Sequence, residues 1–395
     1  VRTPYLPPTM RIPVYLDHAA TTPVRAEVLE AMLPFFGPRF GNPSSVHKWG
    51  REARTALDEA RERVARSLGA QSDEICFTSG GTEGDNLAIL GSWRAVREQR
   101  RAVVSTPIEH KAVLAAVHEI AREGGEERML EVDSVGRVRP ESFEALVDDQ
   151  VALCSVMWVN NEMGVVQDLA PLVARAKAAG AMFHTDAVQA FGKVPIDARA
   201  VPFDSLTISG HKIGAPKGIG AIFIRRGTPL EPLMYGGTQD RGRRPGTENV
   251  AMAVGLAKAA ELAVAEREAS WAALEAMRDR LEAALLARIP DAIVHGRGGP
   301  RAPHILNLSV PGTDSESLLM ALDMQGVACS AGSACQSGSV TPSHVLTALG
   351  VRSDLGAAAV RMSLGALSTD EGITRVTELF PALIEKARRL SGQHG

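Results

Sequence analysis

Three short stretches carry side chains that could do chemistry, and each follows an apolar run typical of a buried strand. Lys212 lies in the Gly- and Pro-rich loop SGHKIGAPKGIG (209–220), after the run DSLTI. Partial desolvation there would lower the pKa of the lysine amine and let it form a Schiff base with a carbonyl. Asp186 follows the run AMFHT, and the turn TSGGTEGDN (78–86) opens a predicted helix. All three are therefore candidate ligand-binding positions.

Each stretch also has a simpler interpretation. Lys212 could be a loop lysine in water, Asp186 an N-cap, and residues 78–86 an ordinary strand–turn–helix connection. The turn lacks the lysine of a P-loop and the G-x-G-x-x-G spacing of a nucleotide fingerprint. Together, however, the stretches supply a phosphate cradle at a helix N-terminus, a carboxylate and an amine, all at carboxyl ends of predicted strands. Pyridoxal phosphate requires these three anchors, for its phosphate, ring nitrogen and aldehyde carbon.

The chain has four cysteines, too few for a disulfide framework, which indicates a reducing compartment. Cys76 and Cys154 lie in apolar runs and are expected to be buried, inert thiols, and Cys329 is expected to end a strand. Cys335 stands apart, in the Gly- and Ser-rich stretch ACSAGSACQSGS (328–339). It could be a nucleophile, a metal ligand or a residue without a role, and the absence of a nearby histidine cluster argues against a metal.

Apolar runs alternate with helical periods through the first 230 residues or so, for example a helix predicted over 48–68 with Gly69 as its stop. Such alternation predicts an α/β domain with a mostly parallel sheet covered on both faces. From about residue 247 a long Ala/Glu/Arg helical region precedes mixed strand and helix signals, which predicts a smaller α+β domain. We expect residues 21–260 to form the large domain, 261–395 the small one, and 1–20 to join the latter.

The overall composition excludes several function classes. The net charge is −3, from 43 basic and 46 acidic residues, and aromatic residues make up 4%. Neither value favours nucleic-acid binding. No apolar run approaches the roughly 20 residues that span a bilayer, and the N-terminal stretch has no apolar signal-peptide core. We therefore expect a cytoplasmic protein without membrane or nucleic-acid partners.

Longer motifs connect these stretches to a known family. They are YLDHAATTPV, FGNPSSVH, FTSGGTEGDN, EHKAVL, VNNEMGVVQD, HTDAVQAFGK, SGHKIGAPKGIGA, RPGTENV, SAGSACQSGSVTPSHVLTALG and VRMSLG, and they extend from about residue 14 to 366. On these motifs the sequence resembles the NifS/IscS-type cysteine desulfurases, within the class V aminotransferase superfamily of pyridoxal-phosphate fold type I. The resemblance implies a seven-stranded, mostly parallel sheet in the large domain, and a homodimer.

The resemblance also implies a role for each matching residue. Lys212 would form the Schiff base with pyridoxal 5'-phosphate, Asp186 would pair with the ring nitrogen, His110 would stack on the ring and shuttle protons, and Gln189 would contact the ring hydroxyl. The phosphate would be held by Thr82, Ser209 and His211, with Gly81 beside them, and Thr247 would reach the phosphate of the neighbouring subunit. The substrate carboxylate would be bound by Asn161, which is also a cofactor contact, and by Arg361, and Cys335 would accept the sulfur. No metal is implied.

Several of these residues have alternative interpretations that rest on local pattern alone. His110 could be a helix-start histidine, and Asn161 a turn residue. Arg361 could be a polar residue on a half-exposed strand, and Thr247 could cap the helix that follows it.

The activity implied by the resemblance is the removal of sulfur from L-cysteine, which gives L-alanine and a persulfide on Cys335. An acceptor protein would then take the sulfur for iron–sulfur cluster assembly or thiolation. A mobile Gly/Ser-rich loop suits a thiol that must visit both the cofactor and an acceptor. The alternatives are a selenocysteine lyase, another class V lyase or aminotransferase, or a non-catalytic scaffold with the same fold.

Overall fold

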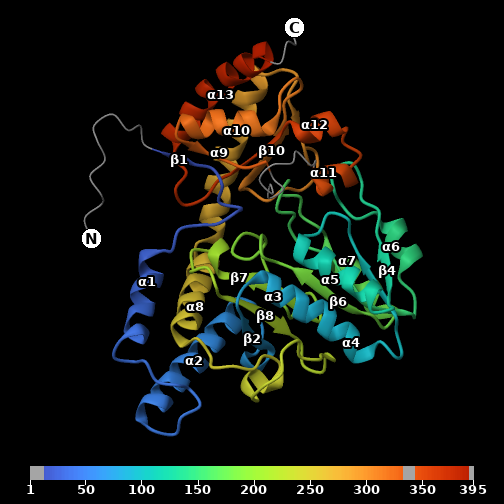
Figure 1. Cartoon of the computed structure of the whole chain (residues 1–395), viewed down its shortest axis with the longest axis vertical. Coiled ribbons are helices and arrows are strands. Elements are labelled where there is room, and N and C mark those ends of the chain that lie inside the picture. The colour runs from blue at the N-terminus through green and yellow to red at the C-terminus, as the bar shows by residue number, and fades with distance from the viewer. Residues whose placement is uncertain (1–12, 332–342, 391–395) are drawn as a thin grey trace.

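The computed structural model describes residues 13–331 and 343–390, which form a larger and a smaller domain (Figure 1). The larger domain contains a seven-stranded sheet with the spatial order β2-β8-β7-β6-β5-β3-β4. Neighbouring strands are parallel except at β8, which is antiparallel to both β2 and β7. The predicted α/β class with a mostly parallel sheet is therefore confirmed. The strands are β2 (Ile75–Thr78), β3 (Ala102–Ser105), β4 (Glu126–Met129), β5 (Val151–Ser155), β6 (Met182–Asp186), β7 (Ser205–Ser209) and β8 (Gly220–Ile224).

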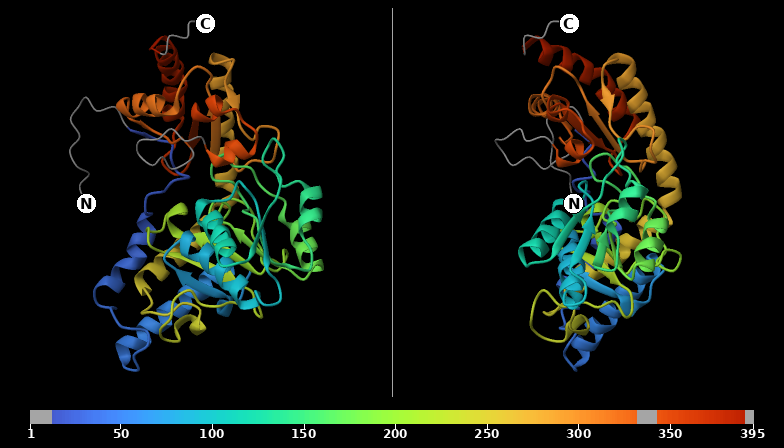
Figure 2. Two further views of the ribbon diagram at one scale, coloured as in Figure 1. Left: turned by 45° about the vertical axis from the view of Figure 1, so that its right-hand side comes forward. Right: turned by 90° about the vertical axis from the view of Figure 1, so that its right-hand side faces the viewer.

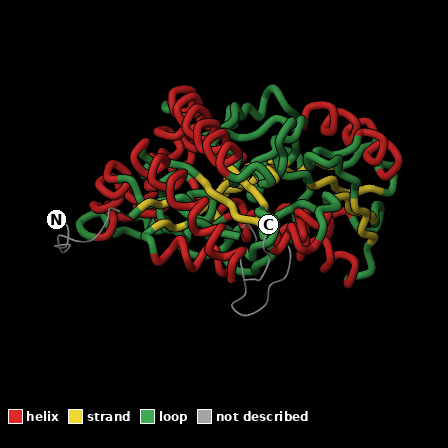
Figure 3. Tube along the Cα trace, turned by 90° about the horizontal axis from the view of Figure 1, so that it is seen from above, coloured by secondary structure: helices red, strands yellow, loops and turns green. Residues whose placement is uncertain are grey.

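Helices cover both faces of this sheet, and Figure 3 shows the strands between layers of helices. Successive side chains of a strand point to opposite faces. Val104 accordingly belongs to the apolar core that includes residues of α2 (Lys48–Ser67), α7 (Leu169–Ala178) and α8 (Val250–Ala265). Val103 belongs to a second core with residues of α4 (Ser92–Val96) and α5 (Lys111–Arg122). Every residue of β3, β5, β7 and β8 is buried for this reason.

The helices of the larger domain connect the strands or pack beside them. They are α1 (Ala26–Met32), α2 (Lys48–Ser67), α3 (Gly81–Asn86), α4 (Ser92–Val96), α5 (Lys111–Arg122), α6 (Pro140–Leu146), α7 (Leu169–Ala178) and α8 (Val250–Ala265), with short helical turns at η1 (Leu33–Phe36), η2 (Ser72–Glu74), η3 (Leu87–Gly91), η4 (Gly210–Lys212) and η5 (Gln239–Gly242). The helix predicted over 48–68 corresponds to α2, which ends at Ser67 and is followed, after its C-cap Leu68, by a left-handed Gly69 with φ 67°.

Strand β4 was not predicted from the sequence. Its residues, EERM, are mostly charged, and it lies at the edge of the sheet with β3 as its neighbour. An edge strand is partly exposed and tolerates charged side chains, so it lacks the apolar signal that identifies the buried strands.

The smaller domain has a three-stranded antiparallel sheet, a two-stranded parallel sheet and helices packed on them. Its elements are β9 (Ile293–Val294), β10 (Ile305–Ser309), β11 (Val327–Ala328), β12 (Ala359–Ser363), α9 (Arg267–Arg288), α10 (Ser315–Met324), α11 (His344–Ala348), α12 (Ser353–Ala357) and α13 (Asp370–Leu390). The N-terminal strand β1 (Val14–Tyr15) pairs with β11, and its Val14 belongs to the apolar core of this domain. The domain boundaries at residues 20 and 260 stay predictions.

The long helical region predicted after residue 247 is two helices, α8 and α9, which meet at Glu266. Helix α9 extends from one domain to the other (Figure 2). Trp271 near its start packs against the core of the larger domain, whereas Leu281 and Leu285 lie in the core of the smaller one. Within the described residues, no helix combines the length and apolarity needed to cross a bilayer.

Candidate active site

A cavity of about 360 Å³ lies at the carboxyl ends of β6 and β7. This is the edge of a parallel sheet at which ligands usually bind. Nearly all of the residues predicted from the sequence line it, namely Gly81, Thr82, His110, Asn161, Asp186, Gln189, Ser209, His211, Lys212 and Arg361. Positions far apart in the chain therefore meet in one place.

One end of the cavity is formed by the start of α3 and the end of β7. Helix α3 begins at Gly81 and continues through η3 and α4 to Val96, so its free N–H groups and dipole face this end. Ser209 is close by, since its Cβ lies 3.7 Å from where a Cβ on Gly81 would stand. His211 contacts Thr21 Oγ1 through Nδ1 at 3.1 Å, and burial lowers its pKa to about 4, so its ring is neutral near pH 7. This end has the features of an anion site.

A close approach of α3 to the sheet sets the position of this helix. A Cβ on Gly84 would stand 2.7 Å from the methyl carbon of Thr207 on β7, closer than packed carbon atoms come. A glycine at this position therefore lets α3 lie directly against β7.

Lys212 lies in η4, directly after β7, with its amine inside the cavity wall. Its Nζ donates to the main-chain oxygens of Ala19 at 2.6 Å and Ala20 at 2.7 Å. Burial lowers the pKa of this amine to about 8; the charge of Arg361 adds to the effect, and the carboxylate of Asp186 opposes it. A substantial fraction of the amine is thus unprotonated at mildly basic pH, as a nucleophilic lysine requires.

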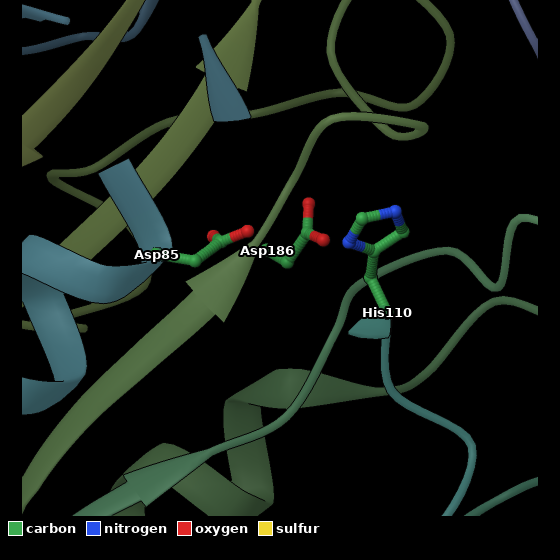
Figure 4. A group of neighbouring side chains, drawn as sticks. All are labelled: Asp85, His110 and Asp186. Atoms are coloured by element: carbon green, nitrogen blue, oxygen red, sulfur yellow. The ribbon is translucent and has the colours of Figure 1, made fainter. Parts of the chain in front are cut away.

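Asp186 stands at the end of β6 between Asp85 and His110 (Figure 4). Its Oδ1 accepts a hydrogen bond from the Val188 N–H at 2.8 Å. Burial raises the pKa of Asp186 to about 7, and the neighbouring Asp85 contributes to the rise. Burial also raises the pKa of Asp85 to about 7. The raised pKa values mean that the positive charges near Asp85 and Asp186 do not offset the burial of these two carboxyl groups.

His110 is both a cavity residue and the N-cap of α5. Its Nδ1 accepts from the Ala112 N–H at 3.1 Å, so the proton of the neutral ring is on Nε2. Burial is the main cause that lowers its pKa. The helix-start interpretation is locally correct, and it is compatible with a role in the cavity because the cap fixes the orientation of the ring.

Arg361 is 3% exposed, so the alternative interpretation of a half-exposed strand position is wrong. The arginine lies on β12, which pairs with β10 and consists of buried residues. Its side chain is covered where the smaller domain packs on the larger one. Its guanidinium donates to the main-chain oxygen of Asn161 at 2.9 Å and to Asp17 Oδ1 at 2.8 Å. The segments around Asp17 and Asn161, both distant in the chain, therefore meet at this cation.

Of the two remaining predicted residues, one lies in a different cavity and the other is not described. Thr247 is exposed and lines a separate cavity of about 240 Å³, together with Thr78 and Ser79. It does not cap the following helix, since Asn249 accepts from the Met252 N–H and is the N-cap of α8. Cys335 lies outside the described residues.

The other cysteines are in or near apolar cores. Cys76 and Cys154 are fully buried, and burial raises the pKa of both thiols. Cys329 directly follows β11, and burial raises its pKa to about 12. These thiols are therefore protonated at neutral pH.

Several cavity residues were not predicted from the sequence, including Asp85, Ser330 and His344. Asp85 had a usable signal, because it lies three residues after Thr82 in a helix and so faces the same side. The other two are in the smaller domain, and only the domain packing brings them here.

Asp85, His110 and Asp186 place three potential ligand atoms within 4.8 Å of one another. This spacing also suits a metal ion. The expectation that the site holds no metal stays a prediction, to be checked by elemental analysis of the purified protein.

Residues 14–376 match the family model described as Aminotransferase class-V. The chain belongs to this family. Among curated relatives it is 43% identical over 382 residues to "Cysteine desulfurase IscS" of Dictyoglomus turgidum, covering 97% of each chain. It is 45% identical over 379 residues to "Cysteine desulfurase NifS" of Azotobacter vinelandii, covering 96% of this chain and 94% of that one.

A solved structure titled "NIFS-LIKE PROTEIN" superposes with a TM-score of 0.89 at 34% identity, over 95% of this chain and 100% of the other. The resemblance to NifS/IscS-type proteins noted from the sequence is therefore confirmed, as is the fold of the class-V family. Class-V aminotransferases are pyridoxal-phosphate enzymes, so the family implies this cofactor.

Proposed function

We propose that the protein is a cysteine desulfurase that converts L-cysteine to L-alanine and transfers the sulfur to Cys335 as a persulfide. The observation that carries this proposal is the convergence of Lys212, Asp186 and the α3 N-terminus on one cavity, in a chain whose relatives bear this name. A class-V aminotransferase that only exchanges amino groups would need the same anchors but no acceptor thiol.

The chemistry of the cavity residues fits pyridoxal phosphate. The buried Asp186–Asp85 pair has raised pKa values, and a protonated pyridine nitrogen would bring the cation that this pair needs. At the other end, the first N–H groups of α3, Thr82, Ser209 and His211 would hold the phosphate. Lys212 would attach to the aldehyde carbon, and His110 would lie beside the ring.

When bound, pyridoxal phosphate supplies an electron sink that acidifies the Cα–H of the amino acid and weakens its β-carbon–sulfur bond. The chain's own residues do the rest. Arg361, oriented by Asp17, would bind the substrate carboxylate with Asn161, and Lys212, with its pKa near 8, would take and return protons.

Cys335 would then accept the sulfur. Its thiolate attacks the substrate sulfur, an S–S bond forms as the β-carbon–sulfur bond breaks, and the remaining carbon skeleton takes up protons. One L-cysteine and one thiol thus become one L-alanine and one persulfide, with no external oxidant or reductant. A second protein, an iron–sulfur scaffold or a thiolation factor, would take the sulfur from Cys335.

A homodimer belongs to the proposal. Large apolar side chains are exposed in the segment from α1 to the start of α2 and in the loop before α8: Leu29, Leu33, Phe36, Phe40, Val46, Trp49, Met234 and Tyr235. Exposed apolar surface of this extent favours burial against another chain. In such a dimer, Thr247 of one subunit would contact the cofactor phosphate bound by the other.

The chain has only four cysteines, which accords with a cytoplasmic location.

The test measures alanine and sulfide formation from L-cysteine, with pyridoxal phosphate and a reductant, for wild type, Cys335→Ser and Lys212→Ala. Cys335→Ser should keep the cofactor absorption band and lose turnover by at least about 100-fold, because the acceptor is gone. Lys212→Ala should lose the band of the attached cofactor.

Wild-type turnover in Cys335→Ser would refute the persulfide step. Amino-group exchange with a keto acid, without alanine from cysteine, would instead indicate an aminotransferase. A strong preference for selenocysteine in a competition assay would indicate a selenocysteine lyase.

A further inference from the structure

A buried histidine that has no part in the reaction described above contacts a cofactor-site residue from the other domain. His304 directly precedes β10 of the smaller domain and is 1% exposed. Its Nε2 lies 3.2 Å from Oε1 of Gln189, which follows β6 of the larger domain and lines the cofactor cavity. The contact therefore crosses the domain interface.

The surroundings of Gln189 determine which way its amide points. Its Nε2 is 2.9 Å from the main-chain oxygen of Ala19, and a carbonyl oxygen can only accept a hydrogen bond. The nitrogen must therefore face Ala19, and the amide oxygen must face His304. An amide oxygen also only accepts, so His304 Nε2 carries the proton and donates.

The protonation state of the His304 imidazole agrees with this hydrogen-bond direction. Burial and the charge of the nearby Lys193 lower the pKa of His304 well below its ordinary value, so the ring is neutral and has a single N–H. The other ring nitrogen, Nδ1, has no hydrogen-bond partner among the described residues. The one N–H is thus committed to Gln189.

We infer that His304 is a positioning residue that fixes the amide of Gln189 as a hydrogen-bond donor toward the cofactor's ring oxygen. The oxygen of the amide is taken by His304 and one N–H by Ala19, which leaves the second N–H for the cavity. Without the His304 donor, the amide oxygen would be left buried without a partner and only the Ala19 oxygen would hold the amide, so the second N–H would be directed less firmly at the ring oxygen. This inference rests on the proposed function, because it concerns how the chain holds the cofactor of that reaction.

The test compares two nearly isosteric replacements that differ in the donor. His304→Gln places an amide N–H at about the reach of Nε2, whereas His304→Met fills similar space without a donor. Pyridoxal phosphate is titrated into the apoproteins, and the visible absorption of the loaded proteins is followed against pH.

His304→Met should weaken cofactor binding by about 3- to 10-fold, the size of one lost hydrogen bond. The pH midpoint of the visible band should rise by about 0.5 unit, because a donor favours the anionic ring oxygen. His304→Gln should restore both values toward wild type. The control is His295→Met, which removes another buried histidine that contacts Ser309 Oγ at 2.6 Å and lines no part of the cofactor cavity. It should lower thermal stability and leave both values unchanged.

The inference is overturned if His304→Met binds and titrates like wild type, or if His304→Gln is as impaired as His304→Met at equal stability. Failure of the wild-type apoprotein to bind pyridoxal phosphate would be a different result, since it refutes the proposed function itself and this inference with it.

Discussion

Asp85 and Asp186 illustrate, at the scale of single residues, how burial changes the chemistry of a carboxylic acid. Both are buried, and Asp85 also contacts the fully buried His184 at 3.3 Å. A carboxylic acid whose pKa is raised by folding binds more protons in the native state than in the unfolded one. Stability then falls as pH rises from the unfolded pKa, near 4, to the folded pKa, about 7 here.

Replacing Asp85 with Asn should flatten this dependence in the apoprotein. We expect the free energy of unfolding of wild type to drop between pH 5 and 7.5 by about 1–2 kcal/mol more than that of Asp85→Asn. Urea unfolding at the two pH values measures the difference. Equal pH dependence in the two proteins would contradict a raised pKa for Asp85.

At the scale of elements, the position of α3 against β7 is decided by the absence of one side chain. The methyl of Thr207 occupies the space into which a Cβ at Gly84 would extend. Because α3 also presents its N-terminus to the cofactor cavity, any shift of this helix should change the affinity for the cofactor as well as the free energy of unfolding.

Gly84→Ala should therefore cost about 1–3 kcal/mol of stability through overpacking, and weaken pyridoxal phosphate binding together with it. Adding Thr207→Ser removes the obstructing methyl and should recover part of both losses. Chemical unfolding and cofactor titration check this. A single substitution that is neutral in both measurements would show that α3 is not held closely against β7.

At the scale of the whole molecule, the proposed homodimer would bury the exposed apolar side chains in the segment from α1 to the start of α2. Phe40 is 70% exposed and Val46 is 88% exposed. A charge placed there has little effect on the folded monomer but is costly in a dimer interface, since it must be desolvated.

We expect wild type to sediment at about twice the chain mass of 41.9 kDa. Phe40→Glu should shift the population toward monomer, with a dissociation constant raised at least about 10-fold. The matched control is Met324→Glu, at a 79% exposed position in the smaller domain, which should leave the mass unchanged. A monomeric wild type, or an equal effect of both variants, would contradict dimerisation through this surface.

Local patterns in the sequence determined the fold class and indicated three stretches of the candidate site, around Lys212, Asp186 and residues 78–86, whereas the other site residues came from the resemblance to a known family. Buried strands appear as apolar runs. Asp186 is the last residue of β6, and Gly81 and Lys212 follow shortly after β2 and β7, so all three lie at carboxyl ends of strands. Edge strand β4 escaped prediction because an exposed strand needs no apolar run.

The tertiary structure decided what depends on contacts between distant segments. The burial of Arg361 and the contact of His304 with Gln189 both arise where the smaller domain packs on the larger one. The direction of the Gln189 amide is a further case, since it depends on an acceptor 170 residues away and a donor 115 residues away. No local pattern encodes such pairings, because hydrogen-bond direction is set by the groups that folding brings within about 3 Å.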